Sequence, residues 1–191
     1  SGRLAGGGWM WEAGSWYYLT GGRMTEGWLL DRGTWYYMDS RTGAMRTGWV
    51  QVDDRWYYFE PSGAMVTGWL RSDGAWYYLS GSGAMVAGWL LDHGTWYYMD
   101  SRTGAMRTGW VQVDDRWYYF EPSGAMATGW LNSGDSWYYM SANGAMSTGW
   151  LNDRGAWYYM DSTGVMVTGT VSIDGRSSLF SSSGQWVGYA S

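Results

Sequence analysis

The side chains best suited to bind a ligand in this sequence are aromatic rings. The chain contains 18 Trp and 17 Tyr but only three Phe. An ordinary core is filled mainly by Leu, Ile, Val and Phe, and this sequence has a single Ile. Trp and Tyr instead combine a flat face, which attracts cations, with a polar group that suits a partly wet surface. The composition therefore predicts rings that work at a surface and not only in a core.

Catalytic groups are sparse in comparison. The chain has no Cys and one His, and a nucleophile–base–acid set cannot recur around a His that a duplicated segment replaces by Arg. The paired carboxylates Asp53–Asp54 and Asp114–Asp115 fall in expected turns and not across a cleft. No phosphate-binding Gly loop and no Cys/His metal spacing is present. We therefore expect a chain that is not an enzyme and uses no metal or cofactor, with any catalytic domain outside it.

A motif of 19 to 21 residues positions the rings and recurs along nearly the whole chain. Each unit opens with Gly-Trp, and a Trp-Tyr-Tyr triplet begins seven residues after that Trp. A Gly and a Met follow before the next Gly-Trp. The spacing between the two Trp never varies, whereas the segment between triplet and Met differs in length. The pattern therefore predicts a rigid element followed by a tolerant loop.

Each unit has the pattern of a β-hairpin. Residues 69–79 place an Asp-Gly turn between two short strands rich in aromatic residues. Because strand residues alternate faces, Trp49 and Gln51 share one face with Trp56 and Tyr58. The opposite face is aliphatic with one Tyr and is the expected core. A lone hairpin is marginally stable, so the hairpins must stack in an all-β solenoid, with Met filling gaps between them.

Internal duplication and a degenerate end give the domain organisation. Residues 27–69 and 88–130 are identical except at two positions, and their offset of 61 residues is three repeats. Three hairpins are therefore expected to form one structural period. From Gly169 onward the triplet is replaced by Ser177, Ser178 and Leu179, as in the atypical end unit of a solenoid. We expect a linker or cloning remnant at 1–7, eight aromatic repeats at 8–168 and a capping repeat at 169–191.

Charge and hydropathy exclude two classes of partner. The net charge is −5 and the chain has no Lys, which argues against binding to a nucleic-acid backbone. No apolar run is long enough to cross a bilayer, and no secretion signal opens the sequence. A chain without Cys is compatible with an extracellular bacterial protein. We expect no nucleic acid, no membrane insertion, and any export signal outside this sequence.

The repeat resembles the choline-binding (cell-wall-binding) repeat of streptococcal surface proteins, autolysins and phage lysins. The resemblance rests on Gly-Trp, a turn, Trp-Tyr-Tyr-Leu/Met/Phe and Gly-Ala-Met-x-Thr-Gly-Trp, and it covers roughly residues 8–168. The glucan-binding repeats of glucansucrases and the repeats of clostridial toxins are related. The resemblance implies a left-handed β-hairpin solenoid. It also implies a secreted or cell-surface module, of bacterial or phage origin, that binds choline groups of teichoic or lipoteichoic acid in the wall.

The resemblance further implies choline cages between consecutive units, each built from two Trp of one hairpin and a Tyr of the next. Alternation puts the second Tyr of a triplet on the Trp face, so we expect Tyr37 and not Tyr36 in the first cage. The ninth unit offers Ser178 and Leu179 in place of the triplet tyrosines, so the pair Trp150/Trp157 is expected to stay empty. The seven expected cages are Trp9, Trp16, Tyr37; Trp28, Trp35, Tyr58; Trp49, Trp56, Tyr78; Trp69, Trp76, Tyr98; Trp89, Trp96, Tyr119; Trp110, Trp117, Tyr139; and Trp130, Trp137, Tyr159.

Physical chemistry supports choline as the ligand. A quaternary ammonium has no proton to donate, so ring faces must hold it, at roughly 0.5–2 kcal/mol per contact. Three rings supply roughly 2–5 kcal/mol, and a millimolar site needs about 4 kcal/mol. A glucan or host glycan is the alternative, because rings also stack on sugars. The Trp face offers few polar groups for sugar hydroxyls beyond Gln51 and Gln112. A purely structural or protein-binding array is the third reading.

Overall fold

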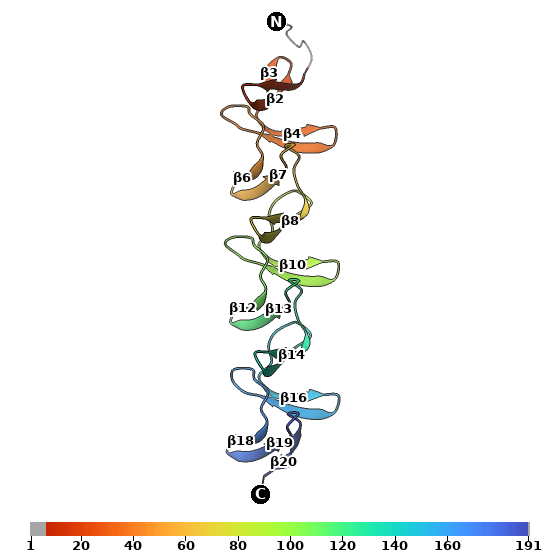
Figure 1. Ribbon diagram of the computed structural model, residues 1–191, viewed down its shortest axis with the longest axis vertical. Helices are drawn as coiled ribbons and strands as arrows, with labels where there is room; N and C mark the ends of the chain where they lie inside the picture. The colour runs from red at the N-terminus through yellow and green to blue at the C-terminus, as the bar shows by residue number, and fades with distance from the viewer. Residues whose placement is uncertain (1–6, 191) are drawn as a thin grey trace. The chain divides into compact units, whose positions relative to one another are not determined.

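The computed structural model describes residues 7–190, and every regular element in this range is a β-strand. The linker expected at 1–7 lies outside the described residues except for Gly7. No described segment forms a helix that could cross a membrane. The chain divides into two compact parts, one with the residues up to 88 and 99–106, the other with residues 89–98 and those from 107 onward. Within each part the strands form successive hairpins (Figure 1).

The hairpins follow one another in chain order, and β3 and β20 each add a third strand to an end hairpin. The strands are β1 (Gly8–Glu12), β2 (Ser15–Thr20), β3 (Arg23–Met24), β4 (Gly27–Asp31), β5 (Thr34–Met38), β6 (Gly48–Val52), β7 (Arg55–Phe59), β8 (Gly68–Ser72), β9 (Ala75–Leu79), β10 (Gly88–Asp92), β11 (Thr95–Met99), β12 (Gly109–Val113), β13 (Arg116–Phe120), β14 (Gly129–Ser133), β15 (Ser136–Met140), β16 (Gly149–Asp153), β17 (Ala156–Met160), β18 (Gly169–Ile173), β19 (Arg176–Phe180) and β20 (Trp186–Tyr189). This confirms the expected all-β chain of repeated hairpins, whereas the left-handed sense of the solenoid stays a prediction.

The hairpin turns are two residues long and use positive backbone φ angles. Between β8 and β9, Asp73 has φ 49° and Gly74 has φ 83°. Between β6 and β7 the two positions are Asp53 and Asp54, at φ 46° and 61°. Turns of this kind match the right-handed twist of the strands, and they favour Gly, Asn and Asp. The paired carboxylates therefore serve as turn residues.

The strand register separates a core face from an aromatic face. In the β4–β5 hairpin, Leu29 is opposite Tyr36 on one face, while Trp28 is opposite Tyr37 on the other. The residue that ends the second strand of a hairpin also lies on the core face. In seven hairpins this residue is fully buried, at 0% exposure: Met38, Phe59, Leu79, Met99, Phe120, Met140 and Met160. The core face is therefore the aliphatic face that the sequence predicts.

Within each part, successive hairpins stack with the aromatic face of one against the core face of the next. Trp28 lies 4.7 Å from Tyr57 and 5.9 Å from Phe59 between ring centroids. Tyr37 also packs on Phe59, at 6.4 Å. Backbone hydrogen bonds also join successive repeats, as where Met65 N–H donates to the Trp35 carbonyl at 2.8 Å. Stacking therefore gives each marginal hairpin the burial that it lacks alone.

Candidate ligand site

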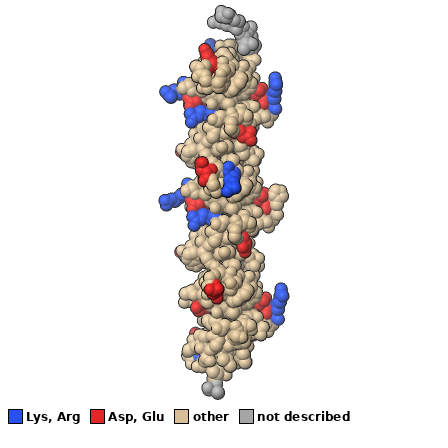
Figure 2. All heavy atoms as spheres, in the orientation of Figure 1, with Lys and Arg blue, Asp and Glu red and all other residues tan. Residues whose placement is uncertain are grey.

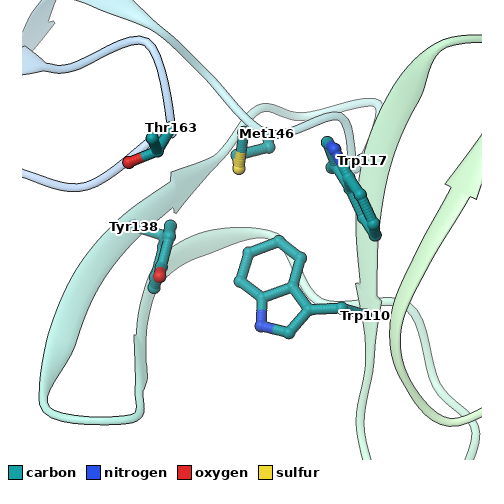
Figure 3. Close-up of a pocket in the computed structure, with 5 residues that line it drawn as sticks. All are labelled: Trp110, Trp117, Tyr138, Met146 and Thr163. Atoms are coloured by element: carbon teal, nitrogen blue, oxygen red, sulfur yellow. The ribbon is translucent and has the colours of Figure 1, made fainter.

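Three described hollows lie at junctions between hairpins, and they share one construction. Both Trp of one hairpin, the first Tyr of the next triplet and the Met that follows this triplet form the walls, and the next loop along the chain adds Ser or Thr. Their volumes are about 370, 230 and 410 Å³. The lining residues are Trp9, Trp16, Tyr36, Met45 and Ser62; Trp110, Trp117, Tyr138, Met146 and Thr163 (Figure 3); and Trp130, Trp137, Tyr158, Met166, Ser182 and Ser183.

The first Trp of a hollow stands at a steep angle to the other two rings. Trp110 and Trp117 have centroids 6.4 Å apart and planes at 80°. Trp110 and Tyr138 are 4.8 Å apart at 63°. Trp9 repeats this arrangement with Trp16 at 6.4 Å and 88°, and with Tyr36 at 4.7 Å and 65°. Walls at such angles present several ring faces to one small group, which suits an alkylated cation.

The tyrosine that lines the described hollows is not the one expected from alternation. The first Tyr of each triplet lines the described hollows, whereas the expected second Tyr lies beside the Trp of its own hairpin. Tyr37 is 5.2 Å from Trp28, and Tyr139 is 5.2 Å from Trp130. The same intrahairpin contact holds Tyr58, Tyr78, Tyr98, Tyr119 and Tyr159.

The physical reason is the direction of stacking. Alternation correctly puts Tyr37 on the Trp face of its own hairpin, opposite Trp28. The hollow at Trp9 and Trp16, however, is closed by the opposite face of the β4–β5 hairpin, and that face carries Tyr36. The first Tyr of a triplet thus packs between hairpins and also supplies the third wall. The Trp pairs of the described hollows lie together as the sequence predicts, and their contact with a ligand stays a prediction.

The last strand residue before the turn of the next hairpin orients the first Trp of several junctions. Trp9 Nε1 donates to Asp31 at 2.9 Å, and Trp130 Nε1 donates to Asp153 at 3.0 Å. At Trp49 and Trp110 a Ser of the next hairpin accepts instead, at 3.2 Å. These hydrogen bonds fix the orientation of the indole in the wall. Sequence reasoning missed them, because the acceptor lies 22 or 23 residues away along the chain.

In two hollows, a lining hydroxyl donates a hydrogen bond to a nearby carboxylate. Thr163 Oγ1 donates to Asp161 at 2.6 Å, and Ser62 Oγ donates to Glu60 at 3.3 Å. Partial burial acts to raise the pKa of Asp161, but hydrogen bonds from the Thr163 hydroxyl and from backbone N–H groups outweigh it and hold this pKa below its ordinary value. Asp161 therefore stays ionised near the mouth, where negative charge favours a cation.

A metal-binding cluster is not assembled in the described range. Residues 7–190 contain no cluster of three or more His, Cys, Asp or Glu side chains that could hold a metal ion. The His93 side chain is 93% exposed, in a hairpin turn beside Asp92. Charged side chains occupy only scattered spots on the face in Figure 2, and most of it is uncharged. The hollows are therefore the candidate site.

Comparisons with known proteins agree with this geometry. The model of a choline-binding repeat matches residues 46–87, 71–108 and 107–148, and that of a cell wall binding repeat matches residues 26–45 and 148–166. A comparison with curated protein sequences gave no match.

Several solved structures share the fold. CbpJ from Streptococcus pneumoniae TIGR4 is 42% identical with a TM-score of 0.85, over 91% of this chain and 62% of that one. Choline binding protein F from Streptococcus pneumoniae, in the presence of a peptidoglycan analogue (tetrasaccharide-pentapeptide), is 38% identical with a TM-score of 0.81, over 90% and 61%. CbpF in complex with ipratropium by soaking is 36% identical with a TM-score of 0.79, over 90% and 62%. The chain thus spans less than two thirds of these relatives.

Proposed function

Because this chain belongs to the choline-binding repeat family, we propose that it is a cell-wall-binding module whose inter-hairpin hollows hold choline groups of teichoic or lipoteichoic acid. The observation that carries the proposal is the three-ring hollow, in which the first Trp stands at a steep angle to the second Trp and to the first Tyr of the next triplet. The trimethylammonium group offers no hydrogen-bond donor, so ring faces are its natural partners. The CbpF complex with ipratropium, itself a quaternary ammonium, supports this ligand class.

Affinity is expected to come from repetition. One hollow with three ring contacts gives roughly 2–5 kcal/mol, which corresponds to a site near millimolar. A polymer with many choline groups can engage several hollows at once and gain about 10²–10⁴-fold by effective concentration. We infer from this that the module itself is non-catalytic, works outside the cell on the wall, and anchors any catalytic domain attached to it.

A titration that follows intrinsic Trp fluorescence tests the function. Choline should change the emission with a midpoint near millimolar, because both Trp of a hollow border the ligand. Ethanolamine, which has the same charge but no methyl groups, is the matched control and should bind clearly more weakly. Equal responses to the two would mean that acidic charge alone attracts the ligand. A response to a glucan oligomer with none to choline would favour the glycan alternative.

A pair of adjacent substitutions tests the assignment of the tyrosine. Tyr138→Leu should weaken choline binding at Trp110/Trp117 by about 2- to 30-fold, since one ring contact is lost. The matched variant Tyr139→Leu should leave that site intact, because Tyr139 contacts Trp130 of its own hairpin. Ligand occupancy in crystals soaked at millimolar choline measures both. Loss at Trp110/Trp117 in the Tyr139 variant alone would restore the second Tyr to the cage.

A further inference from the structure

The last pair of Trp residues has a third ring that the sequence pattern hides. Trp150 and Trp157 are 6.3 Å apart with planes at 84°, as in the other repeats. Ser178 stands at the position of the first Tyr in the ninth hairpin, and at 1% exposure it gives the surface no ring. Trp186, at the start of β20, lies 5.9 Å from Trp150 with planes at 86°. We call Trp150, Trp157 and Trp186 the C-terminal aromatic cluster.

The ninth hairpin stacks on the eighth in the same way as its regular counterparts. Phe180 is 5.8 Å from Trp150, as Phe59 is 5.9 Å from Trp28. A Cβ on Gly184 would meet the Met166 sulfur at 2.3 Å, so the last loop also packs on the preceding Met. The ninth repeat has therefore kept the packing contacts with the eighth, although the residues at the positions that line the regular hollows have changed.

The pairing of β20 with β19 brings the new ring into place. Trp186 is opposite Phe180 in this pairing. In the alignment of the loops, Gly184-Gln185-Trp186 corresponds to Gly164-Val165-Met166, so an indole occupies the position where regular repeats have Met. Tyr189 also contacts that indole, at 5.4 Å and 77°. A small Ser at the Tyr position and a large Trp at the Met position are thus complementary changes.

We propose that the C-terminal aromatic cluster is an additional site for a quaternary ammonium group, with Trp186 as its third wall. The inference rests on the proposed function, since it extends the same ligand to a junction that lacks the Tyr. Trp150 and Trp157 are 41% and 46% exposed, so their rings are accessible. Trp186 stands farther from its partner than the tyrosines do, at 5.9 Å against 4.7 Å for Trp130 and Tyr158. The cluster therefore binds choline more weakly than the regular hollows.

Counting bound choline tests the proposal. In equilibrium dialysis with radiolabelled choline, the wild type should bind one more equivalent per chain than Trp186→Met. Methionine is the residue of the regular repeats at this position, so the variant keeps a side chain that fits the junction and loses only the ring. Trp186→Tyr restores a ring and should recover the extra equivalent. Far-ultraviolet and near-ultraviolet circular dichroism of each variant checks that the hairpins remain stacked.

A choline-soaked crystal locates the additional equivalent. Density between Trp150 and Trp157 in the wild type, absent in Trp186→Met, is the expected result. Equal choline counts in the wild type and Trp186→Met, or density that persists in the Met variant, would overturn the role of Trp186. If neither protein bound choline anywhere, the proposed function itself would fail. Binding at the regular hollows with none at the cluster would reject only this inference.

Discussion

Choline at about 100 times its dissociation constant is expected to raise the melting temperature by roughly 5–10 °C for each site that must empty on unfolding. A ligand that binds only the folded form at this excess stabilises it by about 2.7 kcal/mol. In a domain of this size, each kcal/mol shifts the melting temperature by about 2–4 °C. The hollow at Trp9 draws on two successive hairpins, through Trp16 and Tyr36, and on the loop after the third hairpin, through Ser62. Its ligand therefore opposes separation of the hairpins.

Calorimetry with and without choline measures this shift, and ethanolamine at the same concentration is the control. The shift should grow with choline concentration, because mass action continues after the sites are nearly full. An unchanged melting temperature at tens of millimolar choline would reject a site shared between hairpins. A shift of equal size with ethanolamine would assign the effect to charge.

Gly63→Ala is expected to destabilise the stack more than the same substitution at a hairpin-turn glycine of similar conformation. A Cβ on Gly63 would meet the Met45 sulfur at 2.2 Å and its Cγ at 2.9 Å, with φ at +83°. Left-handed backbone costs a residue with a Cβ about 1–2 kcal/mol, and overpacking adds about 1–3 kcal/mol. Met45 also lines the hollow at Trp9, so choline binding there should weaken as Met45 shifts.

Gly33→Ala is the matched control, since Gly33 has the same φ of +83° and nothing within 4 Å of its added Cβ. Urea unfolding should place Gly33→Ala about 1–2 kcal/mol below the wild type. Gly63→Ala should lie a further 1–3 kcal/mol lower, by about the cost of overpacking. An equal decrease in the free energy of unfolding in the two variants would mean that Met45 moves aside at no cost and that backbone strain alone destabilises the protein.

The hairpins and their faces could be predicted from the sequence because both depend on local rules. A fixed spacing between two Trp, a turn with Gly or Asp and the alternation of strand residues lead directly to the register of Trp28 opposite Tyr37. Burial of Phe59 and Leu79 follows from the same alternation. These features involve residues within one hairpin, where the chain itself limits the geometry.

The third wall of the site could not be predicted from the same rules. Whether Tyr36 or Tyr37 meets Trp9 depends on how two hairpins stack, and alternation within one hairpin does not contain that information. The contact of Trp186 escapes the repeat pattern for a related reason. This residue stands at a Met position of the repeat and lies beside Trp150 where β20 pairs with β19. The differences between the expected and the observed positions of the rings therefore lie at the junctions between repeats.

Because the junctions share one geometry, the number of repeats in the chain can change while the packing between hairpins stays the same. In the duplicated blocks, Trp28 meets Tyr57 at 4.7 Å and Phe59 at 5.9 Å, and Trp89 meets Tyr118 at 4.8 Å and Phe120 at 5.9 Å. Duplication of a stretch of whole repeats therefore reproduces the same packing contacts, because each ring recurs at the same position of the repeat. Unequal recombination between such repeats can change the number of ligand sites, and with it the affinity for a polymer, by one site at a time. The strength of attachment can then evolve through the number of repeats, without any new side chain.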